Sequence, residues 1–227
     1  PAVMARAGRA GALGGTQVIT GGLGGLGLRA AALAVGRGAS CVLLMSRSGR
    51  VSREGQRLGG QLNLLHSIAP HVVSTLAADS AEPAVLLAAT RRFPHLGGIL
   101  HAASTFGANL IRDLRSTDAH ALFNAKAVGA AHAHCSLSCI PLQLALFYSS
   151  LAALAPAFSY AGLGFYAAAC TSVDGLARAR RAAGQRGGAL QMANVADQGS
   201  GALLSDAASR LPGIVRITLD EYSHCVS

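Results

Sequence analysis

Short apolar runs alternate along the chain with longer segments in which apolar residues recur at helical spacing. The apolar runs predict strands at 17–20, 41–45, 72–76, 98–101, 142–148 and 189–192. The intervening segments predict helices at about 25–36, 51–66, 82–92, 110–135 and 161–184. Strands that are aliphatic on both faces and alternate with helices are typical of a parallel sheet covered on both sides. With right-handed crossovers, the pattern predicts an α/β fold with a doubly wound parallel sheet of the Rossmann type.

In such a sheet the ligand lies beyond the carboxyl ends of the strands. The segments that follow residues 20, 45, 101 and 148 are therefore expected to gather around a ligand. Near the C-terminus, Thr218-Leu-Asp-Glu221 has the spacing of a capping box. We expect a last helix to begin there and to be truncated.

A glycine-dense turn joins the first predicted strand to the first predicted helix. Its residues are Thr20, Gly21, Gly22, Leu23, Gly24, Gly25, Leu26 and Gly27. A dinucleotide site needs a sharp turn, backbone that approaches the phosphates without a Cβ, and a helix N-terminus facing the anion. The alternative is a flexible turn in a chain with 28 glycines. Because the flanking strand and helix supply the context of the motif, we predict nucleotide binding.

Residues after the second and third strands bear on the choice of cofactor. Ser46, Arg47 and Ser48 stand where an NAD enzyme usually has a carboxylate for the ribose hydroxyl. An arginine between hydroxyls suits a 2′-phosphate instead, so NADPH is expected, the alternative being an ordinary surface arginine. Asp79 suits either a hydrogen bond from an adenine amino group or the capping of a turn or helix. The sequence favours neither use of Asp79.

Three polar residues form a candidate catalytic group. Ser150 ends the fifth strand and Tyr166 lies on the next helix, so both hydroxyls can polarise a carbonyl over a nicotinamide while the tyrosine supplies its proton. An unaided phenol has a pKa of about 10, so a nearby lysine cation is needed to make the phenol a competent acid near neutral pH. Lys126, on the preceding helix, is the only lysine among 19 basic residues. A compact ammonium fits beside a phenol and ribose hydroxyls where a planar guanidinium does not. The alternative is that one lysine is left over by chance.

Composition excludes several classes of protein. With 227 residues, 51% of them hydrophobic and 13% charged, the chain can bury the sheet of one α/β domain and is not disordered. No apolar stretch is long enough for a bilayer, so no membrane association is expected. The net charge of +9 comes from scattered arginines without aromatic interleaving, which argues against nucleic acid and leaves an acidic partner surface open.

Cysteine usage and the N-terminal segment give two further expectations. Five cysteines without framework spacing suit a reducing compartment, and we expect a cytoplasmic protein. His132, His134, Cys135 and Cys139 lack a paired Cys-x-x-Cys, so we expect no metal. Residues 1–15 have no signal-like apolar core and are interpreted as a linker from a preceding region. The remaining residues, 16–227, are assigned to one NADP-binding domain.

Several motifs together resemble one family. They are Thr20–Gly27, Leu43–Arg47, His101–Ala103, Phe123–Ala130, Phe147–Ser150, Tyr166–Ala177 and Val195–Gly199. In these segments the chain resembles the ketoreductase domain of a modular polyketide synthase, a branch of the short-chain dehydrogenase/reductase superfamily shared with animal-type fatty acid synthases. Most members of the superfamily place a lysine four residues after the tyrosine. The ketoreductases take it from the upstream helix, where Lys126 lies.

The resemblance implies an activity and its partners. The expected reaction is NADPH-dependent reduction of a β-ketoacyl chain held by the phosphopantetheine of an acyl carrier protein, among neighbouring synthase domains. Tyr166 would be the acid, Ser150 the carbonyl donor and Lys126 the residue that orients cofactor and phenol, with further cofactor contacts at Ala102 and Ala103. Two alternatives are a non-catalytic NADP-binding or structural domain of a synthase, and a free-standing reductase of small carbonyls.

The chain also departs from the family pattern. Cys170 occupies the position of an asparagine that helps to hold the lysine and a water relay, so a slow enzyme is expected. The spacing from Ser150 to Tyr166 indicates an insertion at 155–160, which makes Tyr160 a competing candidate for the acid. Met192-Ala193 replaces a Trp-Gly pair of the family. Phe106-Gly107-Ala108 replaces the Leu-Asp-Asp signature, so product stereochemistry is not assigned.

Overall fold

The computed structural model describes residues 12–52, 56–93, 95–107, 109–154, 162–196 and 216–226. Six strands form one sheet in the order β3-β2-β1-β4-β5-β6, and every pairing is parallel. Their bounds are β1 Thr16–Thr20, β2 Cys41–Ser46, β3 Val73–Ala77, β4 Leu96–His101, β5 Leu144–Ser150 and β6 Gly188–Met192. The strand order reverses between β1 and β4, which places the ligand crevice of a doubly wound sheet at their carboxyl ends. The predicted fold class is confirmed.

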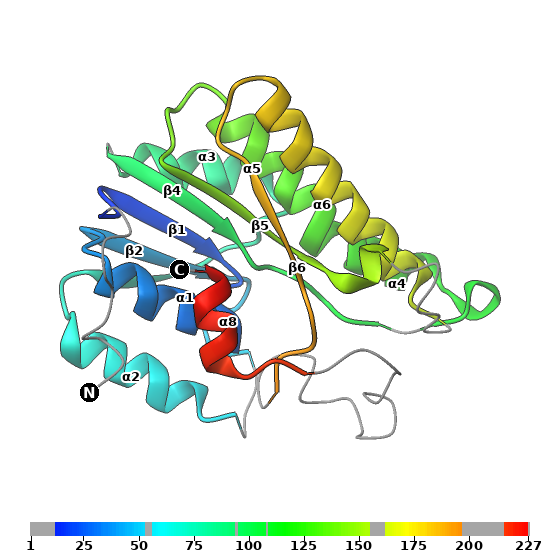
Figure 1. The fold of residues 1–227 in the computed structure, drawn as a ribbon, viewed down its shortest axis with the longest axis horizontal. Coiled ribbons are helices and arrows are strands. Elements are labelled where there is room, and N and C mark those ends of the chain that lie inside the picture. The colour runs from blue at the N-terminus through cyan, green and yellow to red at the C-terminus, as the bar shows by residue number, and fades with distance from the viewer. Residues whose placement is uncertain are drawn as a thin grey trace.

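Helices cover both faces of the sheet (Figure 1). One face is covered by α1 (Gly25–Gly36), α2 (Leu58–Ile68) and α8 (Leu219–Val226). The other is covered by α3 (Pro83–Arg91), α5 (Gly129–Leu137) and α6 (Gly164–Ala182), with α4 (Ser116–Phe123) beside α6. No helix in the described part of the chain is long and apolar enough to cross a membrane.

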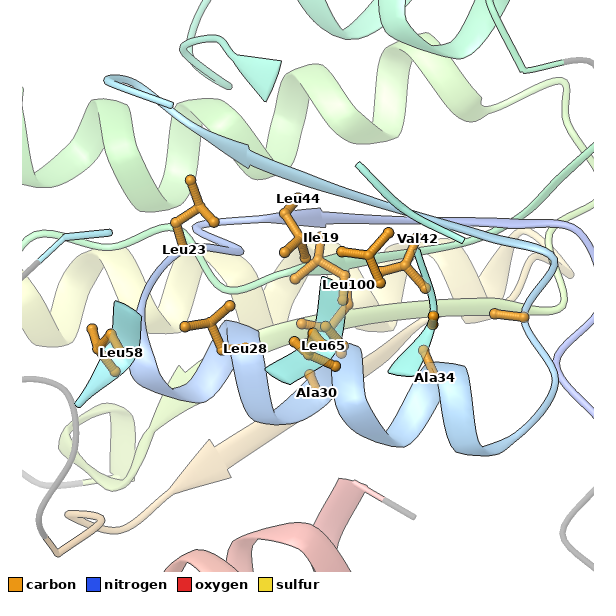
Figure 2. Close-up of a cluster of buried hydrophobic side chains, with 14 of the residues drawn as sticks. Ile19, Leu23, Leu28, Ala30, Ala34, Val42, Leu44, Leu58, Leu65 and Leu100 are labelled. Atoms are coloured by element: carbon orange, nitrogen blue, oxygen red, sulfur yellow. The ribbon is translucent and has the colours of Figure 1, made fainter. Parts of the chain in front are cut away.

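Alternation along the strands builds two separate cores. Val18 belongs to the cluster under α3, α5 and α6, whereas its neighbour Ile19 belongs to the cluster under α1 and α2. Leu43 and Leu44 divide in the same way. Successive strand residues point to opposite faces, so a strand buried on both sides must be apolar at every position. Figure 2 shows strand side chains such as Ile19 and Leu44 on the side of the sheet that faces α1.

Two predicted helices differ from those observed. The segment predicted as one helix at 110–135 contains the 3₁₀ turn η2 (Ile111–Asp113), then α4, the π-helical turn η3 (Asn124–Val128) and α5. The helix predicted to begin at residue 51 begins at Leu58, because Arg57 has a left-handed φ of 55° that interrupts helical geometry. Apolar periodicity extends through such interruptions, so it does not reveal them.

The predicted capping box at the start of α8 is confirmed. The backbone N–H of Glu221 donates to Thr218 Oγ1 at 3.1 Å, and the backbone N–H of Thr218 donates to Glu221 Oε2 at 2.7 Å. Arg29 of α1 holds the helix from the other side by bonding Ser223 Oγ and Asp220 Oδ1, both at 2.8 Å. These contacts dock α8 on α1.

Candidate active site

The glycine turn after β1 is packed so tightly that side chains are excluded. Gly21 has a φ of 67°, and a Cβ there would lie 2.7 Å from the backbone nitrogen of Ala103. A Cβ on Gly27 would lie 2.5 Å from the carbonyl oxygen of Gly21. Because Ala103 follows β4, the turn closes directly over the reversal point of the sheet. The sharp, Cβ-free turn predicted from the sequence is present.

The N-terminus of α1 has the donor set that an anion needs. Gly24 caps the helix without a side-chain hydrogen bond, and no acidic residue lies in the first turn. The first amides of any helix lack intrahelical acceptors, and here no carboxylate competes for them. This chemistry fits the pyrophosphate of a dinucleotide. The side chain of Leu23 packs in the core, so only backbone atoms of that residue are available to a ligand.

The ends of β2 and β3 carry the residues predicted to select the cofactor. Arg47 is exposed and makes no hydrogen bond or ion pair with the described residues. Ser48 follows it on the same exposed loop, where its hydroxyl reaches the Arg50 carbonyl at 3.4 Å. Asp79 Oδ1 accepts the backbone N–H of Ala81 at 2.9 Å, so of its two proposed uses the turn is the one seen here.

His101 links the glycine turn to the candidate lysine, and we did not assign it a role from the sequence. It is fully buried at the end of β4, where its Nδ1 lies 2.7 Å from Thr20 Oγ1 and its Nε2 lies 2.9 Å from the carbonyl oxygen of Lys126. A carbonyl only accepts, so Nε2 carries the hydrogen and Nδ1 accepts from Thr20. Burial, together with the charge of Lys126, lowers the pKa of His101 to about 4 and keeps the ring neutral.

Lys126 is buried inside the fold, on the π-helical turn η3 rather than on a regular helix. Its side chain is 2% exposed, and Nζ donates to the carbonyl oxygen of Tyr148 at 2.8 Å. The ammonium also lies 5.4 Å from the centroid of the Tyr166 ring. Single π turns inside helices are frequent at functional sites. Here the turn sets the only lysine of the chain against β5 and α6.

Tyr166 and Ser150 converge with Lys126, as the sequence predicted. Tyr166 lies near the start of α6, edge-on to the Phe106 ring at a centroid distance of 5.5 Å. Burial raises the pKa of Tyr166 above its ordinary value of 10.0, and Cys170 adds to the rise. The side chains of Ser150 and Ser104 oppose it through hydrogen bonding. The phenol therefore stays protonated well above neutral pH.

One electrostatic prediction was wrong. We expected the lysine cation to lower the pKa of the phenol, whereas the pKa of Tyr166 is raised. The ammonium of Lys126 bonds the Tyr148 carbonyl and meets the face of the Tyr166 ring, not its hydroxyl. Burial is the largest cause of the rise, and Lys126 is not among the groups that lower the pKa of Tyr166.

Cys170 lies one turn after Tyr166 on α6 and is completely buried. Burial raises the pKa of its thiol, and the charge of Lys126 opposes that rise. The thiol is therefore a neighbour of the lysine. Lys126 is nevertheless held, because its bond to the Tyr148 carbonyl does not depend on residue 170.

A pair of phenols behind the site was missed by sequence reasoning. The hydroxyls of Tyr148 and Tyr222 are hydrogen-bonded, and Tyr222 donates onward to the carbonyl oxygen of Leu26 at 2.8 Å. Because the Tyr222 proton is used on Leu26, Tyr148 is the donor within the pair. Burial raises the pKa of both phenols. The pair connects the strand that holds Lys126 with the first turn of α1.

Some candidates fall outside the residues that the structure describes. They are Tyr160, the insertion at 155–160 and Ala108 of the stereochemical signature. Among the described residues, no group of three or more His, Cys, Asp or Glu side chains is arranged to hold a metal. His134, one of the residues weighed for zinc, has its Nδ1 2.8 Å from Arg180 Nη1.

Comparison with known proteins finds similar sequences and structures among polyketide synthases. A hybrid polyketide–nonribosomal peptide synthetase of Aspergillus violaceofuscus, pyvA, is 32% identical over 193 residues, covering 85% of this chain and 5% of its own length. The structure of A-type ketoreductases from a modular polyketide synthase is similar with a TM-score of 0.82 and 26% identity, over 98% of this chain and 46% of that one.

A short-chain dehydrogenase with a shorter chain than the synthases has a similar fold. A short-chain dehydrogenase from Burkholderia cenocepacia in complex with NADP superposes with a TM-score of 0.74 at 20% identity, covering 92% of this chain and 87% of that one. The chain spans only 5% to 14% of the lengths of the synthases that it matches. Residues 15–197 match the family described as the KR domain. The chain therefore belongs to the ketoreductase (KR) domain family of oxidoreductases with a short-chain dehydrogenase fold.

Proposed function

We propose that the chain catalyses NADPH-dependent reduction of a β-ketoacyl thioester, carried on an acyl carrier protein, to the β-hydroxyacyl thioester. The observation that carries the proposal is the convergence of Lys126, Ser150 and Tyr166 beside a Cβ-free turn at the reversal point of the sheet. The KR family and the large synthases among its relatives support a substrate delivered by a neighbouring carrier domain.

The residues of the chain divide the chemistry between them. The Tyr166 phenol, kept protonated by burial, donates its proton to the substrate carbonyl oxygen. The Ser150 hydroxyl donates a hydrogen bond to the same oxygen and stabilises its developing charge. Lys126, fixed by the Tyr148 carbonyl, places its ammonium against the face of the Tyr166 ring and orients the cofactor ribose. Bound NADPH supplies the hydride.

A direct test is reduction of a simple β-keto thioester, followed by the loss of NADPH absorbance. The proposal expects turnover with NADPH and formation of the β-hydroxy thioester in equal amount. Cofactor binding without any turnover would favour the second candidate, a non-catalytic NADP-binding domain. The observation that favours this candidate is Cys170, which places a weakly hydrogen-bonding thiol where an amide would support the lysine.

Replacing Cys170 with asparagine should separate a slow enzyme from a dead one. Cys170→Asn places an amide donor and acceptor beside Lys126 and Tyr166, and one added hydrogen bond of about 1 kcal/mol corresponds to roughly fivefold higher turnover. Steady-state kinetics with the β-keto thioester measures the change. Cys139→Asn, at an exposed cysteine, is the matched control. Unchanged or lower turnover in a variant with an unchanged melting temperature would contradict the prediction.

The cofactor assignment gives a second measurable prediction. NADPH should bind more tightly than NADH. Arg47→Ala should reduce the ratio of the two dissociation constants by about tenfold, since a hydrogen bond to a charged group contributes about 1.5 kcal/mol. Fluorescence titration of both cofactors provides the two dissociation constants. Arg50→Ala, at a nearby exposed arginine, should leave their ratio unchanged. Equal affinities in the parent chain would refute the assignment.

A further inference from the structure

A carboxylate with no role in the reaction described above is buried close to the active-site lysine. Asp174 of α6 is 7% exposed. Its Oδ2 accepts a hydrogen bond from Gln191 Nε2 of β6 at 2.7 Å, while its Oδ1 is buried without a partner in the described structure. Burying a charged carboxylate in this state is costly unless an opposite charge compensates it.

The position of Asp174 on α6 connects it to the reaction. Tyr166, Cys170 and Asp174 follow one another at intervals of four residues, so they share one face of the helix. Lys126 lies against the same face, over the Tyr166 ring. No carboxylate in the described part of the chain approaches Lys126 within the 4.0 Å of an ion pair. Two buried opposite charges therefore lie near the same row of side chains, and neither forms an ion pair with a described residue.

We propose that Asp174 is a positioning residue for the reduction: its carboxylate is the counter-charge of the buried Lys126 ammonium, acting past the Cys170 thiol. The part of this inference that concerns turnover rests on the function proposed above.

Electrostatics agrees with this arrangement. Burial lowers the pKa of Lys126, and Cys170 and Asp174 both raise it. His101, which faces the lysine from β4, is held neutral, and β5 contributes the Tyr148 carbonyl rather than a charge. The flanking helices carry Asp118 and His120 on α4, and His132 and His134 on α5.

The other buried cation does not account for Asp174. Arg180, also on α6, donates to the Arg186 carbonyl at 2.7 Å and bonds His134 at 2.8 Å. The pKa of Arg180 is lowered by burial alone, without an influence of Asp174. Asp174 therefore compensates the lysine.

The consequence concerns the alkaline side of the pH profile. Without the carboxylate, the ammonium loses its proton at lower pH, because the remaining burial disfavours the charged form. The Tyr166 phenol stays protonated above its ordinary range, so the lysine is the first of the two groups to deprotonate. Asp174→Asn should move the alkaline limb of kcat/KM to lower pH by roughly half to one unit.

The single lysine allows a direct test that does not depend on turnover. The chain, produced with ¹³C-lysine and a lysine-free tag, has one lysine Cε resonance, and its titration gives the pKa of Lys126. Asp174→Asn and Asp174→Ser should lower that pKa, whereas Asp174→Glu should restore much of it. Glu82→Gln, which removes an exposed acidic charge, is the charge-matched control.

Gln191→Met separates the effect of the Asp174 charge from that of its hydrogen bond, because it removes the bond to Asp174 and leaves the carboxylate in place. A lysine pKa that falls only when residue 174 is neutral supports the inference. An unchanged pKa in the folded neutral variants, or an equal fall in Glu82→Gln or Gln191→Met, overturns it. A fall without any ketoreduction by the parent chain leaves the counter-charge standing and refutes the proposed function.

Discussion

Replacing Tyr166 with phenylalanine should abolish ketoreduction while leaving the affinity for NADPH nearly unchanged. The substitution removes only the hydroxyl, and the edge-on contact with the Phe106 ring is retained. A positioned proton donor contributes about 10²- to 10⁴-fold to rate, so kcat should fall by at least about a hundredfold. Steady-state kinetics and a fluorescence titration of NADPH give the two numbers.

The control for this experiment uses the competing tyrosine. Tyr160→Phe should reduce the β-keto thioester at the rate of the parent chain, since Tyr160 lacks the alanine-rich helix that follows Tyr166 in the sequence. If Tyr160→Phe is inactive and Tyr166→Phe is not, the alignment of this chain with its family across the insertion is wrong.

Replacing Lys126 with methionine should affect both activity and cofactor binding. Lys126 is 2% exposed and its ammonium bonds the Tyr148 carbonyl at 2.8 Å, so no solvent cation can take its place. We expect kcat/KM to fall by about a hundredfold or more, because the charge beside the Tyr166 ring and the proposed donor to the cofactor ribose are lost together. We also expect weaker NADPH binding, which distinguishes this variant from Tyr166→Phe.

Lys126→Arg tests whether charge alone is sufficient. A planar guanidinium is wider than an ammonium and is fixed as a fork, so we expect it not to reproduce the placement of the ammonium between the Tyr148 carbonyl and the Tyr166 ring. We therefore expect this variant to stay largely inactive despite its charge. Activity close to that of the parent chain would show that the compact ammonium is unnecessary.

Local sequence signals were sufficient to predict the elements around the glycine turn. The predicted helix at 25–36 has those bounds in the structure, and the capping box forms both of its hydrogen bonds. The convergence of Ser150 and Tyr166 also followed from their places at a strand end and on the next helix. For the helix and the capping box the physical cause lies within a few residues of chain, so the sequence alone reveals it.

Other features arise from contacts between distant segments and have no local signature. The interruption of the predicted 110–135 helix at η3 became visible only in the structure. The pKa of Tyr166 depends on how far the fold desolvates it, which residue spacing does not report. The bond between Tyr148 and Tyr222 joins positions 74 apart. The cofactor contacts expected at Ser46, Arg47, Asp79, Ala102 and Ala103 remain predictions.

The hydrogen bond from the Tyr222 hydroxyl to the Leu26 carbonyl has a consequence for folding during translation. The two residues are 196 positions apart, so the first turn of α1 emerges from the ribosome long before its partner exists. Contacts with such large sequence separation form late, after the entropy of closing the intervening chain has been overcome. During translation, the early part of the sheet can assemble while the glycine turn and the start of α1 still lack the hydrogen bond from Tyr222. A nascent chain arrested before residue 222 should therefore bind NADPH more weakly than one that includes Tyr222.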